Sequence, residues 1–168
     1  MAALAGSALL KAATGENASN SDIGGVEMHS VVTGSVEYLV NDDAESIITV
    51  RKLIDQLNWN ENDAQKTTLN FEDPEYPIED LVGIVPTDYS KGYDVREVIA
   101  RLVDQSGFVE LKPKYGLSMV CAQAKIEGFQ CGIIANNGPI DTKGATKAAQ
   151  FIQLCDQANI PLIFLKIF

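Results

Sequence analysis

Apolar residues recur at helical spacing in two stretches of the chain. The first stretch follows Asn41, and its apolar face consists of Ile47, Val50, Ile54 and Leu57. Residues 41–43 are Asn-Asp-Asp, which can cap a helix and place favourable negative charge at its start. This pattern predicts an amphipathic helix that ends near residues 58–60.

The second helical stretch begins at Asp94 and ends before Gly107. Its apolar stripe consists of Val95, Val98, Ile99 and Leu102. Asp94 and Glu97 have the spacing of a capping box, in which Asp94 accepts from the amide of residue 97 and Glu97 reaches back. Residues 60–80, between the two helices, are polar, acidic and broken by two prolines, which predicts a linker and a domain boundary.

The hydrophobic period changes in the last third of the chain. Residues 117–126 and 131–135 are apolar and partly alternating, so they predict a hairpin whose turn lies at 127–130. Helical spacing returns over residues 142–158, with Asp141 or Thr142 as the N-cap.

The last apolar run, residues 160–165, reads as a strand buried on both faces. A right-handed crossover would place it parallel to residues 131–135, which predicts an α/β layer. The chain ends three residues later, so this core would be only half assembled, and we expect the chain to be a fragment. Residues 1–35, rich in small residues and glycine, should form loops and short helices that lie on a larger structure.

Charge narrows the classes of function. The chain has 13 Lys and Arg against 23 Asp and Glu in 168 residues, a net charge of −10 and a pI near 4.4. Such a surface repels phosphate backbones and anionic lipids, so we expect no nucleic-acid partner and no membrane partner. No apolar run approaches the roughly 20 residues of a membrane span, and the N-terminus is too weakly basic for a leader peptide, so an intracellular protein is expected.

The three cysteines do not form a metal-binding motif. Cys121, Cys131 and Cys155 contain no C-x-x-C pair, and His29 is the only histidine, so the ligands of a zinc site are lacking. We expect no metal and predict buried, reduced thiols.

Several runs resemble the carboxyltransferase (beta) subunit of biotin-dependent acyl-CoA carboxylases, of the methylcrotonyl-, propionyl- and acetyl-CoA carboxylase type. The main matching runs are residues 83–104 (GIVPTDYSKGYDVREVIARLVD), 132–138 (GIIANNG), 147–155 (KAAQFIQLC) and 160–165 (IPLIFL). Shorter upstream matches are residues 11–16, Gly24, Gly25, His29, Gly34, Asp42 and Asp43. The resemblance covers nearly the whole chain, and only the last three residues depart from it.

The resemblance implies an α/β, crotonase-like fold, in which strand-strand-helix units form a spiral in each of two tandem domains. It assigns residues 1–78 to the C-terminal part of the acyl-CoA-side domain plus a linker, and residues 79–168 to the N-terminal part of the biotin-side domain. Both domains would be partial. The glycine loops that hold the reaction's oxyanions would lie outside this chain, so the catalytic residues stay unknown.

The implied reaction transfers a carboxyl group from carboxybiotin to the α-carbon of an acyl-CoA. Two oxyanions develop, and preorganised N–H donors rather than side-chain acids and bases stabilise them. The implied cofactor is biotin, carried as carboxybiotin on a partner, with an acyl-CoA as substrate. The implied partners are identical subunits and a biotin carboxylase/biotin carrier subunit, in the cytoplasm or, in a eukaryote, the mitochondrial matrix.

The resemblance also assigns candidate site residues, each with a simpler alternative. Ala135, Asn136, Asn137 and Gly138 would line the biotin-side pocket, because backbone amides at a strand end and a helix start favour an anion. Asn-Gly is, however, also a common tight-turn pair. His29 and Gly34 would lie on the acyl-CoA side, although His29 can equally pack between segments.

Other charged and aromatic residues have ordinary interpretations beside functional ones. Arg96 and Arg101 fit solvated ion pairs with Glu97 and Asp104. Lys112 and Lys114 can meet a CoA phosphate or be ordinary exposed lysines. The aromatic residues of the linker are expected to dock onto another protein surface, either the rest of a longer chain or a second subunit. They are Trp59, Phe71 and Tyr76.

Two other functions stay open. A shortened paralogue could keep the subunit-contact surfaces without catalysis. Thioester hydration or hydrolysis, by contrast, would need a positioned carboxylate pair, and no Glu stands in a setting that singles it out.

Overall fold

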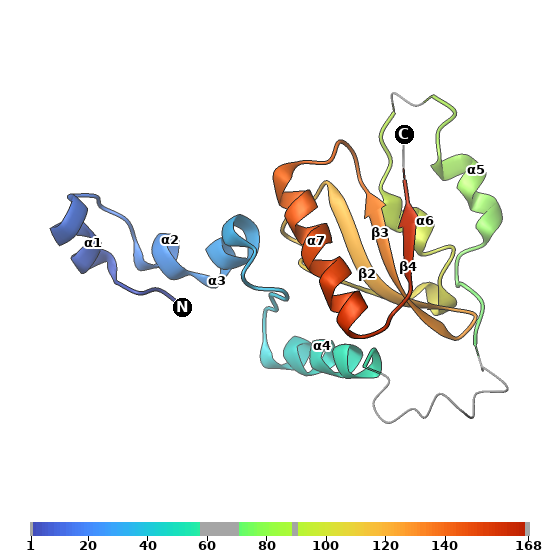
Figure 1. Cartoon of the computed structure of the whole chain (residues 1–168), viewed down its shortest axis with the longest axis horizontal. Coiled ribbons are helices and arrows are strands. Elements are labelled where there is room, and N and C mark those ends of the chain that lie inside the picture. Colours follow the sequence, from blue (N-terminus) through green and yellow to red (C-terminus); the bar gives the residue numbers. More distant parts are fainter. Residues whose placement is uncertain (1, 58–70, 89–90, 167–168) are drawn as a thin grey trace.

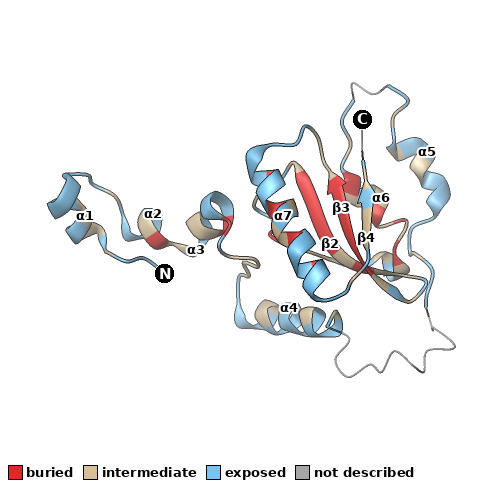
Figure 2. Ribbon diagram, in the orientation of Figure 1, coloured by how far each residue is buried: buried red, intermediate tan, exposed pale blue. Residues whose placement is uncertain are grey.

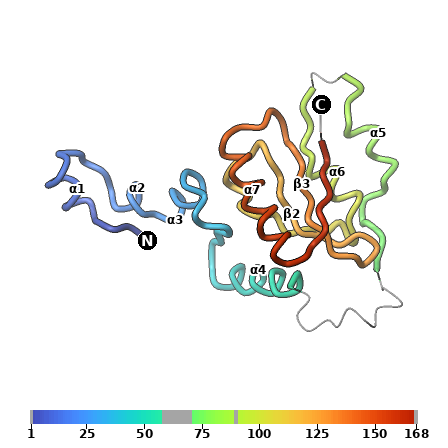
Figure 3. Tube along the Cα trace, in the orientation of Figure 1, coloured from blue at the N-terminus to red at the C-terminus, as the bar shows by residue number. Residues whose placement is uncertain are grey.

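The computed structural model describes residues 2–57, 71–88 and 91–166. Figure 1 shows a body in which a sheet carries helices on both faces, and an N-terminal segment of short helices that lies apart from it. Figure 3 follows the same path as a tube, with the N-terminal part of the chain, in blue, extending away from the body.

The sheet has four strands in the order β1-β2-β3-β4. They span Phe108–Glu110, Met119–Ile126, Phe129–Asn136 and Leu162–Leu165. The pairs β1/β2 and β2/β3 are antiparallel, whereas β3 and β4 are parallel, with Ile133 opposite Ile163. The predicted hairpin and the predicted parallel crossover are therefore both confirmed, and the short strand β1 was not predicted.

The hairpin turn is tighter than predicted. Glu127 and Gly128 both have positive φ, as a two-residue turn of the primed type requires. The carboxylate of Asp104 accepts hydrogen bonds from both of their amides, at 2.8 and 2.7 Å. Strand β3 can therefore begin already at Phe129.

Each face of the sheet has its own apolar cluster. Helix α7 (Thr142–Gln157) covers one face, where Phe151 and Cys155 meet Cys121 and Ile134. Helix α6 (Val95–Ile99) covers the other face, where Val95 and Ile99 pack with residues of β2 and β3. In Figure 2 the two central strands are accordingly buried between exposed helical surfaces.

The remaining helices are short or lie outside the body. They are α1 (Ser7–Thr14), α2 (Asn20–Gly24), α3 (Val26–Met28), a π-helix (His29–Thr33), α4 (Asp43–Asp55), α5 (Leu81–Ile84) and two 3-10 turns (Ile78–Asp80 and Asp104–Ser106). Helix α4 has the predicted cap, since Asp42 accepts from the amide of Glu45 at 2.8 Å. Its apolar stripe, however, stays exposed.

The helix predicted to run from Asp94 to before Gly107 is much shorter, because α6 ends at Ile99. The predicted capping box is also wrong. Asp94 accepts from the amide of Arg96 at 3.0 Å, and the Glu97 carboxylate accepts from Arg101 at 2.9 Å instead of reaching back. The guanidinium of Arg96 also binds both Asp94 oxygens, which draws that carboxylate toward Arg96.

The last strand is partly buried. Ile163 and Leu165 pack against the α6-side cluster, and Leu162 packs against the α7-side cluster, so both faces make apolar contacts. The side chain of Phe164 is nevertheless 63% exposed, and within the described residues β4 pairs with β3 alone. This partial cover agrees with the expectation of a half-assembled core.

The aromatic residues of the predicted linker have different outcomes. Trp59 lies outside the described residues. Phe71 and Tyr76 are exposed. The Tyr76 ring nevertheless faces the guanidinium of Arg101, and the Cζ atom of Arg101 lies 5.1 Å from the ring centroid. Ser106 further holds this segment, because its hydroxyl accepts from the amide of Tyr76 at 3.3 Å. Tyr76 thus docks onto its own chain.

Candidate functional site

The 136–138 loop leaves the end of β3 and leads into the start of α7. The amide of Asn137 donates to the carbonyl oxygen of Ser118 at 2.8 Å, and the amide nitrogen of the Asn136 side chain donates to the Gly138 carbonyl at 3.2 Å. On the other side, the backbone N–H of Val95 donates to Asn137 Oδ1 at 2.9 Å. Hydrogen bonds with Ser118, with Val95 of α6 and within the loop itself therefore hold this loop in place.

Gly138 is the open position of the loop. Its φ of +126° is one that glycine adopts and other residues avoid. A Cβ added here would meet no atom within 4 Å, so the backbone faces free space on that side. Ala135, by contrast, is completely buried in the core, so only its backbone can contribute to a pocket wall.

Asp141 caps helix α7 immediately after the loop. Its Oδ1 accepts from the amide of Gly144 at 2.6 Å and from the hydroxyl of Ser118 at 2.7 Å. These bonds favour the ionised form, so the pKa of Asp141 is lowered, mainly by the Gly144 amide and next by Ser118. Ser118 thus joins the helix cap to the loop.

We expect Asp141→Ala to destabilise the chain at neutral pH and to have little effect in acid. Because the folded pKa is lowered, the stabilisation is fully present above the unfolded pKa of about 3.9 and is lost as the pH falls through the folded pKa. Urea denaturation of both proteins at a series of pH values measures the difference. Asp141→Asn, which keeps a capping oxygen, is the matched control. A difference that stays constant down to strong acid would contradict the prediction.

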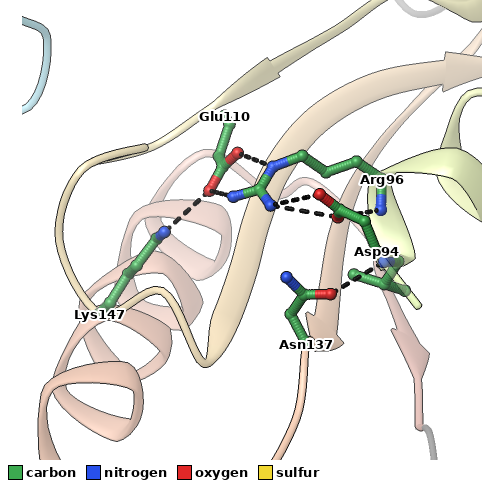
Figure 4. Close-up of polar contacts among 6 residues, drawn as sticks. Asp94, Arg96, Glu110, Asn137 and Lys147 are labelled. Carbon is green, nitrogen blue, oxygen red and sulfur yellow. Dashed lines mark hydrogen bonds and ion pairs between the residues drawn. The ribbon is translucent and has the colours of Figure 1, made fainter. Parts of the chain in front are cut away.

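A buried charge network lies beside this loop (Figure 4), and sequence reasoning missed most of it. Lys147 is 0% exposed, and its Nζ lies 2.9 Å from Glu110 Oε1. Glu110 also accepts two bonds from Arg96, at 2.7 Å from Nε and 3.0 Å from Nη2. The bond to Glu110 is the main reason that the pKa of Arg96 is raised.

One sequence signal pointed to Lys147. The buried positions of α7 are Gly144, Lys147, Phe151 and Cys155, so this lysine falls on the apolar stripe of the helix. A charge on a buried stripe requires a partner. Glu110 gave no comparable signal, because it lies on the three-residue strand β1. The interpretation of Arg96 as part of a solvated pair was wrong, since its main partner is the buried Glu110.

His29 and Gly34 lie in a different part of the molecule, on the π-helix and at its end. His29 Nε2 lies 2.7 Å from the carbonyl oxygen of Ala2, and Nδ1 lies 3.2 Å from the hydroxyl of Thr33. The Thr33 hydroxyl donates to the carbonyl oxygen of His29. If Nε2 donates to the Ala2 carbonyl, Nδ1 is left to accept, and the hydroxyl of Ser35, 3.1 Å away, can donate to it. The ring therefore packs between segments, as one of the two interpretations of this residue expected.

The same histidine lines an open apolar pocket of about 560 Å³. The other lining residues are mainly Ala and Leu of the N-terminal segment, and include Ala2, Leu4, Leu9, Leu10 and Ile23. A shape of this size and polarity suits an organic ligand with an apolar part.

Gly34 joins the N-terminal segment to the body. It has a φ of +65°, and a Cβ added to it would lie 2.8 Å from the ring of Tyr115. The Nζ of Lys143 lies 5.5 Å from the centroid of the same ring. Only a residue without a side chain allows this close packing.

The two lysines considered for a phosphate contact differ in exposure. Lys112 is buried, and it donates to Gln150 at 2.6 Å and lies 3.7 Å from Glu37. Lys114 lies 3.5 Å from Glu27 at the surface. Lys112 is therefore a structural residue, whereas Lys114 forms an exposed ion pair of small energetic value.

The three cysteines are buried and free, as predicted. Burial raises the pKa of Cys121 to about 12 and that of Cys131 to about 11, so these thiols stay protonated and are poor nucleophiles. Within residues 2–57, 71–88 and 91–166, no three His, Cys, Asp or Glu side chains gather closely enough to hold a metal ion. No helix in the same ranges is long and apolar enough to cross a bilayer.

Comparison with known proteins adds to this picture. A family model described as the carboxyl transferase domain matches residues 2–166. The chain is 44% identical over 163 residues to the mitochondrial methylcrotonoyl-CoA carboxylase beta chain of Dictyostelium discoideum, which covers 97% of this chain and 28% of that protein. It is 42% identical over 163 residues to the biotin-dependent 3-methylcrotonyl-coenzyme A carboxylase beta1 subunit of Mycobacterium tuberculosis (strain ATCC 25618 / H37Rv), covering 97% and 31%.

Solved structures resemble the chain as well. Transcarboxylase 12S, determined as a hexamer assembly with hydrolysed methylmalonyl-coenzyme A bound, superposes with a TM-score of 0.84 at 35% identity, covering 96% of this chain and 33% of that one. The beta subunit of P. aeruginosa geranyl-CoA carboxylase gives a TM-score of 0.56 at 46% identity, covering 97% and 30%. The chain thus spans about three tenths of the length of the relatives it matches.

Proposed function

Because the chain belongs to the carboxyl transferase domain family, as its motifs predicted, we propose that it works within a subunit that transfers a carboxyl group from carboxybiotin to the α-carbon of an acyl-CoA. The observation that carries this proposal is the 44% identity over 97% of the chain to a methylcrotonoyl-CoA carboxylase beta chain. The α/β fold expected from the motifs is confirmed by the likeness to transcarboxylase 12S.

The proposed division of labour follows the two candidate sites. Residues 1–78 would belong to the acyl-CoA side, where the apolar pocket at His29 supports a ligand with an acyl part. Residues 79–168 would belong to the biotin side, where the open backbone at Gly138 supports the close approach of the biotin ring.

The proposed role of the 136–138 loop is to shape the biotin-side pocket. Carboxybiotin supplies the carboxyl group, and the oxyanion left on biotin needs preorganised N–H donors. The amide of Asn137 already donates to Ser118, so it is not free to serve as one of those donors. Asn137 and Gly138 would instead form a fixed wall of the pocket that orients the ring and excludes water.

The proposed partners are identical subunits and a subunit that carries biotin and its carboxylase. The exposed apolar stripe of α4 and the exposed Phe164 on the edge strand support contacts with further protein surface. The relatives include a mitochondrial protein and a mycobacterial one, so the mitochondrial matrix or the bacterial cytoplasm is the proposed location.

A segment exchange tests the proposed function. Residues 2–166 replace the matching segment of the Dictyostelium beta chain, and the product is combined with the biotin-carrying subunit of that enzyme. We expect ATP-dependent carboxylation of methylcrotonyl-CoA, with the unaltered beta chain as the control. An exchanged subunit that elutes as the control does by size exclusion but lacks activity would contradict the proposal and favour a non-catalytic paralogue.

A further inference from the structure

The charge network beside the 136–138 loop is electrically balanced. Lys147 and Arg96 carry positive charge, and Glu110 and Asp94 carry negative charge. These residues come from α7, α6, β1 and the cap of α6. Removing charges from water is costly, and apolar residues of similar volume are often equally stable in such places. The Lys147–Glu110 pair, with side chains 0% and 8% exposed, is the buried part of this network and calls for an explanation beyond stability.

Glu110 is the rigid centre of the network. Its side chain is 8% exposed and accepts three charge-assisted hydrogen bonds, one from Lys147 and two from Arg96. Lys147 is 0% exposed, so water is not available as an alternative partner for its ammonium group. The two oxygens of Glu110 are therefore held in one orientation.

Arg96 extends this rigidity to the start of α6. Nε and Nη2 bind Glu110, while Nη1 lies 3.1 and 3.2 Å from the two oxygens of Asp94. Asp94 in turn caps α6 by accepting from the amide of Arg96 at 3.0 Å. One planar guanidinium thus fixes the helix start relative to the buried pair.

Val95, the first residue of α6, contacts the candidate site. The backbone N–H of Val95, which is 1% exposed, donates to Asn137 Oδ1 at 2.9 Å (Figure 4). The position of the start of α6 therefore sets the position of the Asn137 side chain. Through Asn137 it also sets the position of the 136–138 loop, which leads to α7.

We propose that Arg96 is a positioning residue of the biotin-side loop. It holds the loop through Asp94, Val95 and Asn137, while Glu110, bound to Lys147, fixes the guanidinium of Arg96. This inference rests on the proposed function for the identity of the ligand at the loop. Lysine cannot replace arginine in this role, because an ammonium group lacks the planar fork that binds two carboxylates at once.

The test is Arg96→Lys in the exchanged subunit, which keeps the charge and leaves the Lys147–Glu110 pair intact. Arg51→Lys, the same change at an exposed position on α4, is the matched control. We expect KM for the biotinylated carrier to rise, so that kcat/KM for the carrier falls on the order of tenfold to a hundredfold, with KM for the acyl-CoA unchanged. A loss of folded protein alone would lower the apparent kcat and leave both KM values unchanged, and this result would overturn the proposal.

A second readout does not depend on activity. Hydrogen exchange of the Val95 amide reports on its bond to Asn137, and we expect it to accelerate on the order of tenfold in Arg96→Lys but not in Arg51→Lys. The amide of Ile133, in the centre of the sheet, should exchange as before in both variants. An unchanged exchange rate of the Val95 amide in Arg96→Lys overturns the proposal, whatever the activity. Inactivity of the exchanged subunit without substitutions would overturn the proposed function alone.

A double variant tests the route through Asn137. If Arg96 acts through this side chain, Arg96→Lys combined with Asn137→Ala should lower kcat/KM for the carrier no further than Asn137→Ala alone. Losses that multiply would show that the two residues act independently, and the proposed route would be wrong.

Discussion

Glu110→Gln is expected to lower the free energy of unfolding by about 3–5 kcal/mol, the usual result of removing one partner of a buried ion pair. The substitution leaves Lys147, which is 0% exposed, without a counter-charge. It also removes the carboxylate that binds Arg96 at two points, although Arg96 keeps its contact with Asp94. Urea denaturation followed by circular dichroism measures the loss.

A cycle of variants separates the charge effect from the packing effect. Lys147→Met removes the other partner and leaves Glu110 bound to Arg96, so a smaller loss is expected. Glu110→Gln combined with Lys147→Met buries no unpaired lysine, so the double variant should be more stable than Glu110→Gln alone. Glu79→Gln, the same change at an exposed carboxylate, is the control. A double variant less stable than Glu110→Gln would contradict the interpretation.

Phe151→Ala is the second large effect, with an expected loss of about 3–5 kcal/mol in the free energy of unfolding. The ring is 2% exposed and belongs to the apolar cluster between α7 and the sheet. A Cβ added to Gly132 would lie 3.1 Å from Phe151 Cε1, so the ring packs directly on the backbone of β3. Truncation leaves a cavity there, because close-packed surroundings relax only in part.

Phe129→Ala is the matched control for this second prediction. Phe129 is on the same strand, β3, but its side chain is 66% exposed. The same chemical change there should alter the free energy of unfolding by no more than about 0.5 kcal/mol. Equal losses for the two variants, measured by urea denaturation, would show that α7 does not pack on the sheet in this way.

The regular elements that the sequence predicted well are those with a local signal. Alternation over residues 117–126, the Asp141 cap and the stripe of α7 each depend on residues a few positions apart. The helix after Asp94 was predicted too long and with the wrong cap, because its apolar stripe continues beyond Ile99 into turns that also pack on the core. Local periodicity does not distinguish a helix from successive turns in that case.

The candidate site shows a similar division. Residues 136–138 are proposed as site residues because a strand end, an Asn-Gly pair and a helix cap follow one another in the sequence, and because these residues resemble a known family. The bond from Val95 to Asn137 joins residues 42 positions apart, and no pattern in the sequence indicates it.

The sequence by itself determined helices α4 and α7, the hairpin, the crossover and the family of this protein, since periodicity, caps and motifs are properties of neighbouring residues. Only the tertiary structure decided that Lys147 meets Glu110 across 37 positions and that Arg96 links this pair to α6. The physical reason is that the value of a charge or an apolar side chain depends on what excludes water around it. That environment exists only once distant segments pack together.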